Sequence, residues 1–221
     1  MVILIVVGLG SISLKVQSFV KVKKMQISDN LRAVEERIKR SCITSKIELS
    51  KVKILAVSKK MNVEKIQEAY NAGLNSFGEN YASEGLEKID FFRNRSVYLD
   101  WHFIGPIQSN KTKVIAENFD WVHSVSTLKV VKRLATQRPF KLGPINIFIQ
   151  VNLSEEPNKS GARVNDLREI IRQLTGFETL QVRGLMTIPE NTPNCSVVKD
   201  RFRTLKSLQQ ELREDFTYYN P

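Results

Sequence analysis

The stretch ILAVSKK, residues 54–60, separates two candidate folds for this chain. Its apolar run predicts a short buried strand, which ends abruptly at Ser58, Lys59 and Lys60. A dinucleotide-binding sheet would carry a GxGxxG turn directly after its first strand, and Ser-Lys-Lys stands there instead. The GLGS at 8–11 lies upstream of the repeating pattern and does not supply that turn. The stretch therefore favours a closed (β/α) barrel over an open doubly wound sheet.

Downstream of this stretch, short apolar runs alternate with helical patterns, which predicts a parallel sheet covered by helices. The expected strands, starting with the quoted one, are 53–58, 75–78, 100–104, 121–125, 145–153 and 181–188. Between them, Asn62 and Asn165 stand where the N-terminal cap of a helix is expected. Six strands are fewer than the eight of a complete barrel. The predicted fold class is therefore α/β, a (β/α) TIM-type barrel that is incomplete.

The first 24 residues differ from the rest of the chain. Their leading run MVILIVVGLG is too short to span a bilayer and lacks the basic leading segment of a secretory signal. From Met25 onward the sequence turns into an ordinary amphipathic helix. We therefore expect residues 1–24 to be an extension or a miscalled start, and residues 25–221 to form one domain. A weakly membrane-associating segment is the alternative for 1–24, without stable insertion.

The net charge of +11 does not indicate a nucleic-acid partner, because no single arm of the chain holds it. Within the basic zone 108–141, Lys129, Lys132 and Arg133 alternate with apolar residues, which predicts the solvated face of a helix. An RNA-binding module would also be expected to show an aromatic RNP-type strand or an RGG tract, and the sequence contains neither.

Cysteine and histidine are scarce in this chain. Cys42 and Cys195 lie far apart and form no CxxC spacing, which predicts a reducing compartment without a disulfide framework. With only His102 and His123 as further ligands, we expect no metal site.

Polar residues gather at the carboxyl ends of the expected strands, where the chemistry of a barrel is located. In chain order they are Ser58-Lys59, Gly78 to Tyr81, His102, His123-Ser124, Asn152 with Ser154, and Met186-Thr187. A histidine on a strand can equally be a core residue, and Asn80 can cap the next helix. Together, a lysine, an asparagine and a histidine on one rim suggest a site for a small polar or anionic ligand. The neutral amine of a lysine attacks aldehydes to give a Schiff base.

Strand alternation separates the two lysines. Leu55, Val57 and Lys59 share one face, and Ser58 and Lys60 share the other. If the first set faces the barrel axis, Lys59 points into the mouth of the barrel. The pattern leaves open which set faces inward, because both faces of a covered sheet are apolar.

From about Leu31 to about Phe216, the sequence closely resembles the pyridoxal phosphate homeostasis proteins, a family of pyridoxal phosphate (PLP)-binding proteins. The strings that carry the resemblance are ILAVSKK (54–60), AGLNSFGENYASEGLEKI (72–89), WHFIGPIQSNK (101–111), FDWVHSV (119–125), NIFIQVNLSEEPNKSG (146–161) and VRGLMTIP (182–189). As a set in this order they are highly specific.

The resemblance implies a single barrel like the N-terminal domain of alanine racemase. It also implies a protein that binds pyridoxal 5′-phosphate as a lysine Schiff base, helps to balance the B6 vitamers, and has no established turnover. By similarity, Lys59 is the Schiff-base lysine and Asn80 lies near the cofactor. His102, Asn152 and Met186 match positions that line the same barrel mouth. The family further implies a cytoplasmic protein, and we expect a monomer.

The alternative function is a PLP-dependent, racemase-like enzyme. Alanine racemases add a second, β-rich domain and an opposing tyrosine base, and the mostly helical stretch after Met186 offers neither. We therefore expect no catalytic residues.

This sequence departs from the family's pattern at its end. Family members continue with a Ser-Met-Gly-Met-Ser-type strand and an Arg-Ile-Gly-type turn, whose amides and hydroxyls hold the cofactor phosphate. The present sequence reaches Pro221 with neither segment. We therefore expect a truncated chain that is poorly soluble and binds the cofactor more weakly than a full-length relative.

Overall fold

The described part of the chain folds around one parallel β-sheet. The computed structural model describes residues 3–8, 26–154, 160–174, 176–190 and 192–216. Within these residues seven strands pair in chain order, and every neighbouring pair is parallel. They are β1 (Ile3–Gly8), β2 (Val52–Val57), β3 (Ser76–Glu79), β4 (Asp100–Phe103), β5 (Trp121–Val125), β6 (Ile145–Gln150) and β7 (Leu180–Met186).

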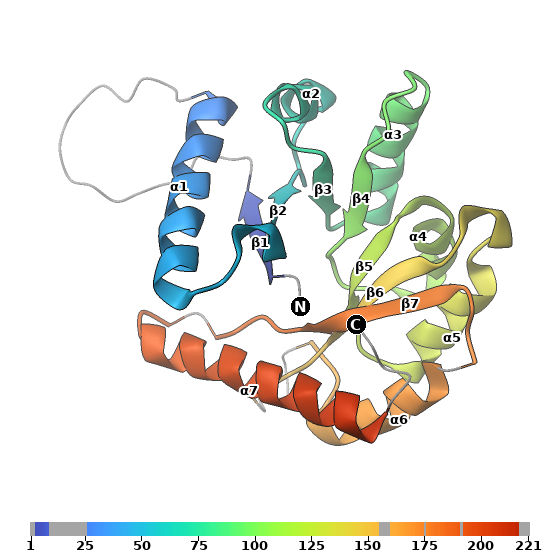
Figure 1. Cartoon of the computed structure of the whole chain (residues 1–221). Helices are drawn as coiled ribbons and strands as arrows, with labels where there is room; N and C mark the ends of the chain where they lie inside the picture. The colour runs from blue at the N-terminus through green and yellow to red at the C-terminus, as the bar shows by residue number, and fades with distance from the viewer. Residues whose placement is uncertain (1–2, 9–25, 155–159, 175, 191, 217–221) are drawn as a thin grey trace.

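Strands β2 to β7 are the six strands that the sequence predicts. Strand β1 adds a seventh, because it lies inside the segment 1–24 and pairs with β2 from Ile3 beside Val52 to Gly8 beside Val57. The remainder of that segment lies outside the described residues. The sheet curls and has β1 and β7 as its two edges, so the prediction of an incomplete TIM-type barrel is confirmed (Figure 1).

Helices follow the strands in regular alternation, as a (β/α) fold requires. They are α1 (Ile27–Ser45), α2 (Val63–Asn71), α3 (Ala82–Arg93), α4 (Thr112–Asn118), α5 (Leu128–Gln137), α6 (Val164–Leu174) and α7 (Cys195–Asp215). Short 3₁₀ turns occupy Leu49–Lys51, Ser109–Lys111 and Phe140–Leu142. Helix α1 packs beside α2, and α7 runs along β7 at the other edge of the sheet (Figure 1). None of the described helices is long and apolar enough to cross a membrane.

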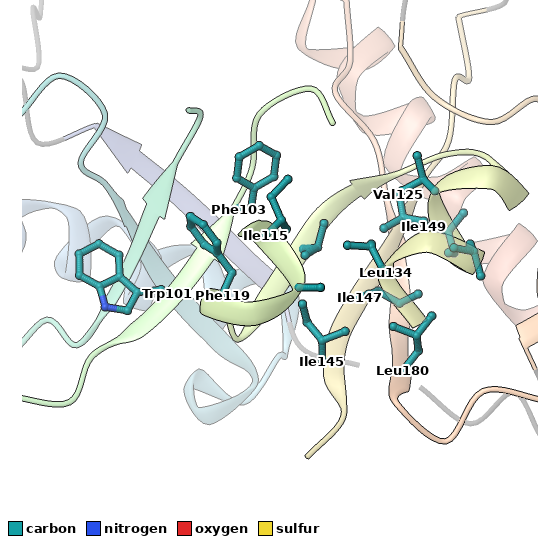
Figure 2. Close-up of a cluster of buried hydrophobic side chains, with 14 of the residues drawn as sticks. Trp101, Phe103, Ile115, Phe119, Val125, Leu134, Ile145, Ile147, Ile149 and Leu180 are labelled. Carbon is teal, nitrogen blue, oxygen red and sulfur yellow. The ribbon is translucent and has the colours of Figure 1, made fainter. Parts of the chain in front are cut away.

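The core lies between the sheet and the helices. Val122 of β5 and Ile147 of β6 are fully buried, as are Ile115 of α4 and Leu134 of α5. Figure 2 shows how aliphatic side chains from strands and helices meet in this layer, with the aromatic residues at one end. Each buried side chain of this size contributes about 1.5–3 kcal/mol. Because alternate side chains of each strand point into this core, the side chains between them point to the opposite face of the sheet.

Two predictions about helix caps have different outcomes. Asn62 caps α2 as expected, since its Oδ1 accepts a hydrogen bond from the Lys65 backbone N–H over 3.2 Å. The prediction for Asn165 is wrong, because α6 begins at Val164 and Asn165 already lies in its first turn. The spacing of apolar residues identified this helix correctly but not its first residue.

Candidate functional site

The candidate site lies on the face of the sheet that is turned away from the core, the inner face. Strand register places four of its residues side by side: Val57, Gly78, His102 and Trp121. The residues that alternate with them, Ala56, Phe77 and Trp101, belong to the buried core. The face of Val57 is therefore the inner one, which decides the alternative that the sequence left open.

Lys59 stands in a tight turn directly after β2. The Met61 backbone N–H donates to the Ser58 carbonyl oxygen over 2.9 Å, so Lys59 and Lys60 are the two central residues of a β-turn. Lys60 has a φ of 61°, in the left-handed region that residues other than glycine rarely adopt. Lys59 follows Val57 by two positions, and its exposed side chain forms no hydrogen bond with the described residues. Its amine is therefore available to a ligand.

Asn80 stands directly after β3 and follows Gly78 by two positions. Its backbone packs closely against the end of β4, where a Cβ on Gly105 would lie 2.1 Å from the Asn80 carbonyl oxygen. Only glycine fits at that position. The side-chain Oδ1 of Asn80 is buried and has no hydrogen-bond partner among the described residues. A buried acceptor without a partner destabilises a fold by about 1–3 kcal/mol, which a ligand donor would relieve.

His102 and His123 form a buried pair on the inner face. His102 Nδ1 and His123 Nε2 lie 2.9 Å apart, and the rings pack against Trp121 and Phe148. Burial lowers the pKa of His102 to about 2, and nearby positive charge acts in the same direction. Burial likewise lowers the pKa of His123 to about 4. Both rings are therefore neutral at pH 7, and His102 Nε2 has no partner in the described part of the chain.

Asn152 and Met186 lie at the carboxyl ends of β6 and β7. Asn152 Oδ1 accepts hydrogen bonds from the backbone N–H and the hydroxyl of Ser154, at 3.1 Å and 3.0 Å. Met186 ends β7 and is paired in register with Gln150. The first three predicted site residues thus belong to neighbouring strands, since Lys59 follows β2, Asn80 follows β3 and His102 lies on β4. The other two stand beyond β5 on the same sheet.

Sequence reasoning missed one group of residues at this site. Glu79, Glu84 and Lys88, hereafter the clamp, contact the turn that carries Lys59. Lys88 Nζ lies 2.7 Å from a carboxylate oxygen of each glutamate. The only signal in the sequence is the i, i+4 spacing of Glu84 and Lys88 on the helix after GENY, which by itself predicts an exposed ion pair. The burial of Lys88 depends on how that helix meets the end of β2.

The parallel strands, the covering helices and the lysine at a strand end define a class of barrel domain. The family model of the alanine racemase N-terminal domain matches residues 26–219, and the chain belongs to this family. The matched span contains β2 to β7 and all five predicted site residues.

Within this family the chain stands among the pyridoxal phosphate homeostasis proteins, as the resemblance implied. It is 42% identical over 190 residues to the pyridoxal phosphate homeostasis protein of Pasteurella multocida. The match covers 86% of this chain and 82% of the relative.

Solved structures show the same fold. PipY of Synechococcus elongatus PCC7942, at 31% identity, matches without PLP at a TM-score of 0.75, covering 86% of this chain and 83% of PipY. The PLP-bound structure of PipY matches at a TM-score of 0.70, and the match covers 82% of each chain. Alanine racemase from Corynebacterium glutamicum matches at 0.61 with 15% identity, over 84% of this chain and 50% of the racemase. The last likeness shows the fold alone.

Proposed function

We propose that this chain binds pyridoxal 5′-phosphate at the inner face, with Lys59 as its Schiff-base residue, and serves PLP homeostasis. The observation that carries the proposal is the amine of Lys59, which has no hydrogen-bond partner among the described residues and stands on a constrained turn at the carboxyl end of β2, the strand that pairs with the one before Asn80. PipY, whose structure has PLP bound, supports it as a neighbour at 31% identity.

The residues present fit the aldehyde and the polar character of this cofactor. An aldehyde condenses with a primary amine to form a C=N bond and release one water molecule, and Lys59 supplies the amine. Asn80 Oδ1 and His102 Nε2 are buried polar atoms without partners among the described residues, so both can contact a polar ligand. Asn152 and Met186 are proposed to line the same mouth from β6 and β7.

The assignment of Lys59 is tested by reduction with borohydride in the presence of PLP, followed by peptide mass mapping. We expect the label on Lys59 in the native chain. Lys59→Arg should abolish the absorbance change on PLP addition, because a guanidinium does not condense with the aldehyde. Lys60→Arg is the matched control and should retain both the absorbance change and the label. A label carried mainly by Lys60 would contradict the proposal.

We further propose that the chain is not an enzyme. The name of the Pasteurella relative describes homeostasis, and the likeness to alanine racemase is one of fold at 15% identity. Incubation of the PLP-loaded chain with L-alanine should therefore produce no D-alanine above the level of free PLP. Turnover that is lost in Lys59→Arg would instead support the racemase-like alternative.

We also propose a cytoplasmic monomer that has no nucleic-acid partner. The family resemblance supports the compartment, and both Cys42 and Cys195 are free thiols, as is usual in a reducing environment. Size-exclusion chromatography with light scattering should give the mass of one chain, and cell fractionation tests the compartment.

A further inference from the structure

The buried ammonium of Lys88 lies directly behind the turn that carries Lys59. Its Nζ donates to the Ser58 carbonyl oxygen over 2.8 Å and to a carboxylate oxygen of Glu79 and of Glu84 over 2.7 Å each. The residue is only 5% exposed. These bonds use all three N–H groups of the ammonium, so Lys88 has no donor left for a ligand.

The two carboxylates of the clamp extend this attachment to both sides of Lys59. Glu79 Oε1 accepts a hydrogen bond from the Ser58 hydroxyl over 2.5 Å. Glu84 Oε1 accepts one from the Lys60 backbone N–H, also over 2.5 Å. The residue before Lys59 and the residue after it are therefore both fixed by the clamp, whereas the side chain of Lys59 is free to meet a ligand.

The buried ion pairs of the clamp are not explained by a contribution to the free energy of unfolding. Burial raises the pKa of the Glu79 carboxyl, although the bonds from Lys88 and Ser58 oppose that rise. Buried ion pairs are often no more stabilising than apolar residues of the same size. The left-handed φ of Lys60 is a further unfavourable feature, and such strain persists where the surroundings fix it, commonly at functional sites. All these features converge on a single four-residue turn.

We propose that the clamp is a positioning site, which fixes the turn so that Lys59, and not Lys60, presents its amine at the inner face. The inference rests on the proposed function of Lys59 and deepens it. The two lysines are adjacent and chemically identical, so only the conformation of the turn distinguishes them. Glu84 of α3 accepts a hydrogen bond from the backbone N–H of Lys60, and this bond ties the turn to α3 at the residue after Lys59. A fixed backbone also limits the positions that the Lys59 amine can take, so less conformational freedom is lost on reaction than from a mobile turn.

The test measures which lysine is modified, together with the apparent Kd for PLP from an absorbance titration. Glu84→Ala removes the acceptor for the Lys60 N–H, and we expect a roughly tenfold weaker Kd and a substantial share of label on Lys60. Glu84→Gln keeps an acceptor oxygen and should stay within about threefold of the native Kd. Glu87→Gln changes an exposed carboxylate of the same helix and should alter neither quantity.

Lys88→Met removes the centre of the clamp and should give a larger shift of label to Lys60 than Glu84→Ala. Circular dichroism and thermal unfolding show whether each variant is folded. If Lys88→Met does not fold, the Glu84 series decides the matter, because the Glu84 side chain is 27% exposed and its loss leaves a smaller defect.

The outcomes separate the inference from the proposed function. A native chain labelled on Lys60, or on neither lysine, would overturn the function of Lys59 whatever the clamp variants do. A native chain labelled on Lys59, with the same Kd and the same site of label in folded Glu84→Ala and Lys88→Met, would overturn the clamp alone. A shift of label to Lys60 in these variants, restored in Glu84→Gln, supports both.

Discussion

Lys60 is the residue at which the geometry of the site is under most strain. Its φ of 61° places a side chain with a Cβ in a region that glycine occupies at no steric cost. The turn nevertheless keeps this conformation, because Glu84 and Lys88 bind it from α3. The unfavourable φ of Lys60 is therefore offset by the bonds that hold the turn, directly beside the lysine that we assign to the cofactor.

Lys60→Gly should stabilise the folded chain. Glycine removes an unfavourable left-handed conformation of about 1–2 kcal/mol but is more flexible in the unfolded state, so we expect a net gain of about 0.5–1 kcal/mol. The backbone N–H that donates to Glu84 is unchanged by the substitution. Urea unfolding gives the free energy of unfolding. Lys59→Gly is the matched control and should show no such gain, since only Lys60 of the two central residues has a positive φ.

Sequence could distinguish candidate site residues from their neighbours only where a strand positions them. Alternation in ILAVSKK separated Lys59 from Lys60 but left open which face is the inner one, and the register of β2, β3 and β4 shows that it is the face of Val57. Lys88 was not predictable, because its spacing from Glu84 is that of any exposed ion pair. Its role arises where a helix meets a strand end that is 30 residues away in the sequence.

Among the elements, the ends of β3 and β4 depend on one another through a backbone contact. Ile104 donates its N–H to the Glu79 carbonyl oxygen over 2.9 Å, and Gly105 then passes directly over Asn80. This approach fixes the backbone of Asn80 at the rim, and the Oδ1 of the same residue is buried. The absence of a side chain at position 105 is therefore a requirement of the site as well as of the sheet.

Gly105→Ala should disrupt this contact. The new methyl would lie 2.1 Å from the Asn80 carbonyl oxygen, so the backbone must move, and we expect a loss of about 1–3 kcal/mol in the free energy of unfolding. Gly176→Ala is the matched control, because a Cβ there meets nothing within 4 Å. Chemical denaturation of both variants measures the difference. Equal stability of the two would show that β4 tolerates a side chain at this point.

Sequence predicted the elements well where apolar periodicity was strong, and less well elsewhere. The alternating runs identified β2 to β7 because buried parallel strands are short and apolar. Residues 3–8 share that composition, but no strand–helix pattern surrounds them, so their pairing with β2 could not be predicted. The start of α6 at Val164 differs from the prediction for another reason, because periodicity defines a helix face more sharply than its ends.

At the scale of the whole molecule, the curled sheet has β1 and β7 as its edges, and β1 covers the edge of β2. In a complete barrel the first strand pairs with the last, and here β1 takes that neighbouring position next to β2 through six paired residues. The inner face holds the neutral histidine pair in its middle, and Lys59, the lysine that we propose for the cofactor, follows β2 near one edge of the sheet. Because burial lowers the pKa of both rings, their protonation changes the free energy of unfolding of the whole chain.

The stability of the whole chain should fall with acid in a range set by this pair. The unfolded chain takes up protons at His102 and His123 below their ordinary pKa of 6.5, whereas the folded chain keeps both neutral, with pKa values of about 2 and about 4. The unfolded state therefore binds more protons as the pH falls from 6.5. Each histidine lowers the free energy of unfolding by up to about 1.4 kcal/mol per pH unit in that range, and neither has an effect above it.

Urea unfolding at about pH 7, 6 and 5 measures this slope above the range where most carboxyl groups titrate. The raised pKa of Glu79 acts in the opposite direction, because the folded state then binds a proton before the unfolded state does. His123→Gln keeps a polar side chain but removes one titrating ring, so its slope between pH 6.5 and 5 should be about half that of the native chain. A slope unchanged in this variant would mean that His123 is protonated in the folded chain, and the 2.9 Å contact with His102 would then join a charged ring to a neutral one.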